Sequence, residues 1–84
     1  MSERVDRVNE IAAEMEEIVN IGDHLYKARR QLECLYEKME TAEVAAEVED
    51  EERLQVAHMI VTLGSLEHKW LALLREKEVE ARRA

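Results

Sequence analysis

The sequence predicts an all-α protein folded as a long antiparallel helical hairpin of coiled-coil type. Large apolar residues recur at helical spacing in two segments, and an acidic stretch without Leu, Ile, Met or aromatic residues separates them. The 84 residues include no proline and only two glycines, so signals that would end a helix or turn a strand are scarce. Together these observations favour two long helices joined by one solvated turn, within a single domain over residues 1–84.

The first apolar series predicts a helix over about residues 3–41. It has one member every seven residues: Ile11, Ile18, Leu25, Leu32 and Met39. Ser2 is the expected N-cap. Gly22 is the candidate break that would give a three-helix bundle instead, but the seven-residue phase crosses it without a slip. We therefore expect a continuous helix in which Gly22 packs closely against the indole of Trp70.

The acidic stretch predicts a turn over about residues 42–50. Its acidic residues are Glu43, Glu47, Glu49, Asp50, Glu51 and Glu52. Like charges three and four residues apart disfavour a helix, and Asp50 is the expected N-cap of the next one. One unbroken helix through this stretch is the main rival, because its alanines and glutamates are good helix formers. Functionally, the acids are either a solvated linker or a docking surface that mimics nucleic-acid phosphates.

The second apolar series predicts a helix over about residues 51–82. Its members lie three and four residues apart: Val56, Met59, Leu63, Leu66, Trp70 and Leu73. A chain that folds back near residue 46 places Ala28 opposite Gly64. Arg29 lies beside the apolar face of the first helix, and we expect its long stem to carry the charge to the solvent.

Both helices carry a second apolar stripe that a two-helix seam does not cover. The residues predicted to form an interface are Leu54, Ala57, Val61, Gly64, His68 and Leu71 on the second helix, and Val8, Met15, Val19 and Tyr26 on the first. Contiguous apolar patches of this extent mark interfaces. We expect the chain to complete a four-helix bundle as a homodimer, or to dock on another protein.

Charge and hydropathy narrow the partners and the location. The net charge of −8 disfavours direct binding to nucleic acid or to an anionic membrane. The longest run without a formally charged residue is too short to span a bilayer, so the cytoplasm is the expected location. The single cysteine, Cys34, leaves no internal disulfide to form.

The sequence predicts no catalytic, cofactor-binding or metal site. None of the three histidines has Glu, Asp, Cys or His three or four residues away, as a metal site on one helix face requires. Cys34 has no histidine three or four residues away to act as a general base, and we expect a structural or incidental thiol. The expected function is a non-enzymatic protein–protein interaction module: a cytoplasmic adaptor, partner chaperone or regulator. The alternative is an acidic nucleic-acid mimic that inhibits a DNA- or RNA-binding protein by occupying its basic groove.

Overall fold

A computed structural model describes residues 3–84 as two long helices and a short connection. Helix α1 runs over Glu3–Thr41, the single 3-10 turn η1 over Ala45–Glu47, and helix α2 over Asp50–Arg83. The proposed Ser2 cap lies outside the described residues. Helix α1 passes through Gly22 without interruption, so the three-helix alternative is wrong.

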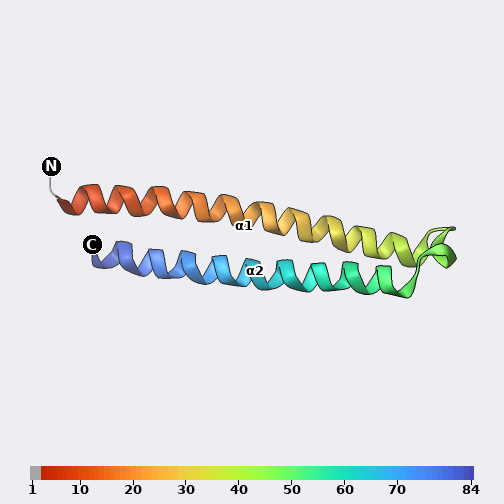
Figure 1. The fold of residues 1–84 in the computed structure, drawn as a ribbon. Coiled ribbons are helices and arrows are strands. Elements are labelled where there is room, and N and C mark those ends of the chain that lie inside the picture. The colour runs from red at the N-terminus through yellow and green to blue at the C-terminus, as the bar shows by residue number, and fades with distance from the viewer. Residues whose placement is uncertain (1–2) are drawn as a thin grey trace.

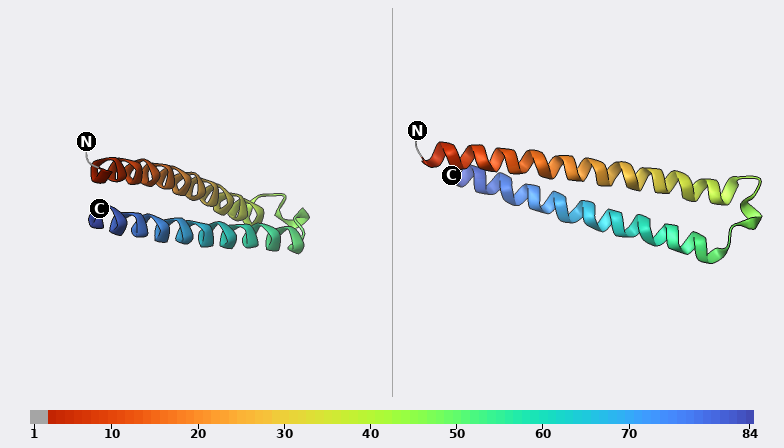
Figure 2. Two further views of the ribbon diagram at one scale, coloured as in Figure 1. Left: turned by 60° about the vertical axis from the view of Figure 1, so that its left-hand side comes forward. Right: turned by 45° about the horizontal axis from the view of Figure 1, so that its top comes forward.

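The two helices lie antiparallel, with both chain ends at one end of the molecule and η1 at the other (Figure 1). Two further views show the same side-by-side arrangement (Figure 2). The particle is a rod of 65 × 15 × 12 Å. The predicted helical hairpin is therefore confirmed, and a single unbroken helix is excluded.

The seam between the helices is built from the two apolar series. Ile11, Ile18 and Val56 are the buried hydrophobic residues of the described chain. The other members of both series are half-buried, with one exception. Met59 is 50% exposed and so contributes less to the seam than the other members do. A rod of two helices thus has a narrow core.

The connection is tied by backbone and side-chain hydrogen bonds. The Arg53 guanidinium donates to the carbonyl oxygen of Ala45 at 2.8 Å, which holds η1 against the first turn of α2. The N-cap of α2 is Glu49 and not Asp50 as expected. The reason is a capping box: the backbone N–H of Glu49 donates to the Glu52 carboxylate at 3.1 Å, while Glu49 keeps an extended backbone.

The expected close packing of Gly22 against Trp70 is wrong. A β-carbon at Gly22 would meet no described atom within 4 Å outside its own helical backbone. The two residues do line the same open groove, so the predicted facing register holds while the contact does not. Gly64 faces the stem of Arg29, whose Cδ would lie 4.0 Å from a β-carbon there, and Ala28 is exposed.

Candidate interaction surface

An open groove runs along one side of the hairpin near its middle. We call it the central groove. Its lining residues are Ile18, Val19, Gly22 and Arg29 from α1 and Gly64, Glu67, His68, Trp70, Leu71 and Leu74 from α2. Glu67 and Leu71 line both of its halves, so the surface is continuous. Apolar side chains from both helices therefore meet on one side of the seam.

The helical spacing extends this side in both directions. Val8, Met15 and Tyr26 lie at seven- and four-residue steps from Val19, so they continue its stripe along α1. On α2, Leu54, Ala57 and Val61 continue the stripe of Gly64, His68 and Leu71 toward the turn.

Four of the ten residues expected at an interface line the central groove directly: Val19, Gly64, His68 and Leu71. Along the extended stripe, Leu54 is 70% exposed and Val61 66%, whereas Met15 and Ala57 are half-buried. These apolar residues recur at helical spacing, as a patch along one side of each helix requires.

Arg29 does not extend to the solvent as expected but bridges the helices. Its guanidinium pairs with Glu67 of α2 and with Glu33 on its own helix, and it lies over the Tyr26 ring at 5.4 Å from the centroid. The hydrogen bond with Glu67 is the largest cause of a raised Arg29 pKa. This pair places a neutralised polar unit within the central groove, where its two halves meet.

Sequence reasoning missed Glu67, Trp70 and Leu74 as groove residues. Trp70 was assigned to the seam alone, but as a long, half-buried side chain it reaches both the seam and the groove. The sequence does contain a signal for Glu67. This acid and the base Arg29 lie at nearly facing positions beside the two apolar faces, where they could form an ion pair. That signal depends on knowing the facing register, which the fold supplies.

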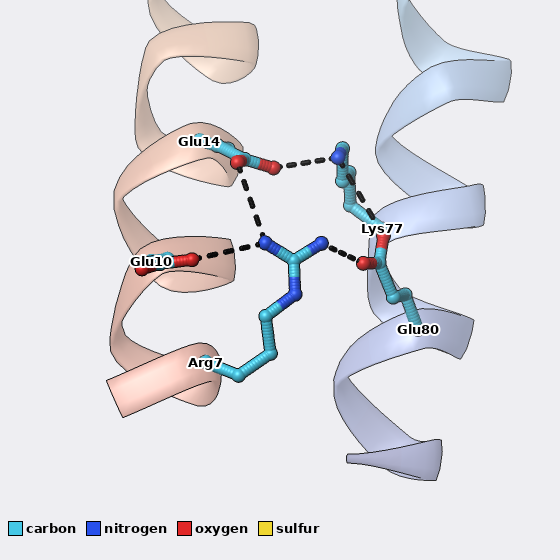
Figure 3. Close-up of polar contacts among 5 residues, drawn as sticks. All are labelled: Arg7, Glu10, Glu14, Lys77 and Glu80. Atoms are coloured by element: carbon cyan, nitrogen blue, oxygen red, sulfur yellow. Dashed lines mark hydrogen bonds and ion pairs between the residues drawn. The ribbon is translucent and has the colours of Figure 1, made fainter. Parts of the chain in front are cut away.

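A second ion-pair cluster joins the helices near the chain ends. Arg7 reaches from α1 to Glu80 of α2, and it also contacts Glu10 at 3.1 Å and Glu14 at 3.9 Å. Lys77 lies 2.5 Å from Glu14 and 3.5 Å from Glu80. Figure 3 shows the two basic side chains between the acidic ones of both helices. The hydrogen bond from Arg7 lowers the pKa of Glu80, and the one to Glu14 raises the pKa of Lys77.

The acidic side chains around the turn are all exposed: Glu43, Glu47, Glu49, Asp50, Glu51 and Glu52. Three of them have local roles. Glu49 and Glu52 form the capping box of α2, and Asp50 pairs with Arg53 at 3.1 Å. Half of this acidic set therefore stabilises the start of α2.

The remaining features concern metal binding, membrane crossing and two single side chains. Among residues 3–84, no three His, Cys, Asp or Glu side chains gather as a metal site would require. No helix in the described chain has the length and hydropathy needed to cross a membrane. Cys34 is exposed, and Tyr36 has a raised pKa because its hydroxyl hydrogen-bonds to Glu40.

Comparison with protein-family models, with curated proteins and with solved structures finds no match to this chain.

Proposed function

We propose that the protein is a non-enzymatic helical interaction module that acts as a cytoplasmic adaptor, partner chaperone or regulator by binding through the central groove. The observation that carries this proposal is that exposed apolar side chains of both helices meet on one side of the seam. Val19 is 53% exposed and Leu71 45%, and a partner helix laid along the groove would cover both.

The composition of the groove supports a protein partner. Apolar and aromatic side chains, among them Val19, Trp70 and Leu71, line much of it, and the charged pair Arg29–Glu67 lies where its two halves meet. Aromatic residues and arginine are enriched at protein–protein interfaces. Gly22 and Gly64 have no side chain, so the groove has space at these two positions for a helix backbone to approach.

The second candidate, an acidic inhibitor that mimics nucleic acid, rests on the exposure of all six acids at the turn. The local roles of Glu49, Asp50 and Glu52 in starting α2 account for part of this acidity without any partner. The groove therefore has the stronger support.

Two sets of substitutions separate these functions. In the first, Val61→Ser with Leu71→Ser makes the groove side polar, and both side chains are exposed enough to leave the hairpin folded. We expect at least a tenfold loss of binding, whether to a second copy or to a partner copurified from the native host, because a well-packed apolar contact contributes more than 1.4 kcal/mol. Sedimentation and titration calorimetry measure the loss.

The matched control is Met59→Ser with Leu35→Ser, which removes exposed apolar side chains that do not line the central groove. In the second set, Gln replaces the six acidic residues of the turn. If binding survives the groove substitutions but is lost with the Gln set and with added salt, the groove proposal is wrong and the mimic is favoured.

A further inference from the structure

We propose that the occupant of the central groove is a second copy of this chain, docked antiparallel to form a four-helix bundle. This inference rests on the proposed function, since it assigns the partner of the same groove. Three observations carry it: the surface area of the hairpin, the continuity of the groove and the placement of charge along the rod.

The surface area of one hairpin is large for a monomer of its mass. The 9.8 kDa chain exposes 6610 Å². A compact monomer of that mass exposes about 5,200 Å². The excess of about 1,400 Å² exceeds the roughly 800 Å² that each partner contributes to a standard stable interface. The described chain has three buried hydrophobic side chains, and a second layer of helices would enlarge this small core.

The groove is centred near the point where the twofold axis of a dimer would pass. The midpoint of α2 falls between Leu66 and Glu67, and Glu67 lines both halves of the groove. A twofold axis near this point brings the groove of one chain onto the groove of the other, because an isologous interface uses the same patch twice. The apolar stripes then run outward from the axis on both sides.

Charge placement selects the antiparallel orientation. The segment 40–52 at the turn end contains seven acidic residues and no basic residue. A parallel dimer would place two such segments side by side, and that repulsion opposes association. An antiparallel dimer places them at opposite ends of the bundle instead.

The antiparallel arrangement also brings opposite charges level with each other. Asp50 and Glu51 lie about 24 Å from the midpoint of α2 along the helix axis. Arg82 and Arg83 lie the same distance away on the other side, and both are exposed. The acidic start of α2 in one chain is therefore level with the basic end of α2 in the other.

The Arg29–Glu67 pair is compatible with this docking. Both groups are paired within one hairpin before a partner arrives. The pair enters the interface as a neutralised unit, so no lone charge loses its hydration when the groove closes.

The first measurement is the mass of the purified chain by analytical ultracentrifugation at tens of micromolar. We expect twice 9.8 kDa, falling to the monomer mass on dilution. Arg82→Gln with Arg83→Gln should weaken the dimer about tenfold at low salt. Lys27→Gln with Arg30→Gln removes the same charge from cations that pair within α1, and this control should leave the dimer intact.

Orientation is measured by double electron–electron resonance with nitroxide labels in a Cys34→Ala background. A label at Ala46→Cys, exposed in η1 beyond the start of α2, should give an interchain distance of more than about 50 Å in the antiparallel dimer. A parallel dimer would bring these labels within roughly 20 Å, since neighbouring helix axes lie about 10 Å apart. A label at Ser65→Cys, near the midpoint, should give a short distance and so reports that the dimer has formed.

The outcomes separate the two proposals. A folded monomer at all concentrations that still binds another protein through the groove overturns the second copy and leaves the interaction module standing. A short distance between the Ala46→Cys labels overturns the antiparallel orientation. A folded monomer without any groove-dependent binding overturns both.

Discussion

Gly22 and Arg29 together set how open the central groove is. Gly22 lies on the groove wall without a side chain to fill it, whereas the Arg29 guanidinium turns across the seam to Glu67. The seven-residue repeat identified the seam residues, but it does not report the direction of a side chain beside the seam. That is why the close contact between Gly22 and Trp70 was wrong, and why Arg29 was expected at the solvent.

At the residue scale, Gly22→Ala should stabilise the isolated hairpin by about 0.5–1 kcal/mol. Glycine inside a helix loses more backbone entropy than alanine does, and the added methyl group has free space. Urea unfolding followed by the fluorescence of Trp70 at low protein concentration measures the change. Ala13→Gly at an exposed site of the same helix is the control and should give a loss of similar size. A loss with Gly22→Ala under the same conditions would show that this part of the groove is closed.

At the scale of the elements, the helices are joined by one apolar seam and by ion pairs at two levels of the rod. The pair Arg29–Glu67 lies near the middle, and the cluster around Arg7, Lys77 and Glu80 lies near the chain ends. Such partly solvated pairs add little free energy, so their main effect is to fix which turn of α1 faces which turn of α2. The apolar repeat alone is compatible with shifts of one heptad, and the ion pairs distinguish these registers.

Acid should loosen the helix pairing near the chain ends. Because Arg7 lowers the pKa of Glu80 in the folded chain, this carboxylate contributes stability above the ordinary glutamate pKa of 4.5, and the contribution is lost as pH falls through the lower folded value. Melting temperature measured between pH 6 and about pH 3 should therefore fall. Glu80→Gln should flatten that fall slightly, whereas Glu76→Gln, at an exposed site without an ion pair in the described chain, should not. Identical curves for both variants would contradict the role of Glu80.

At the scale of the whole molecule, the hairpin is a rod with one narrow core and a second apolar face. Its extents of 65 × 15 × 12 Å leave each helix covered along one line only. A second hairpin on the groove side would supply the missing layer, as in a four-helix bundle.

Stability should then depend on protein concentration. If folding and association are coupled, the melting temperature rises with the logarithm of concentration. Circular dichroism from about 1 to 100 μM should show a shift of several degrees, because each tenfold change alters the free energy by about 1.4 kcal/mol. Val61→Ser with Leu71→Ser should abolish the shift. A concentration-independent melting temperature in the unaltered chain would contradict the coupling.

The sequence by itself determined the two helices, the position of the turn and all but one of the seam residues. These follow from local chemistry: helical periodicity, the lack of proline and the like charges of the acidic stretch act over a few residues each. Only the tertiary structure decided that Glu49 caps α2, that Arg29 pairs with Glu67, and that Gly22 lines an open groove. The capping box depends on the backbone angles of the turn. The Arg29–Glu67 pair and the position of Gly22 depend on how the two helices pack. Side chains distant in sequence come into contact only when the two helices have packed.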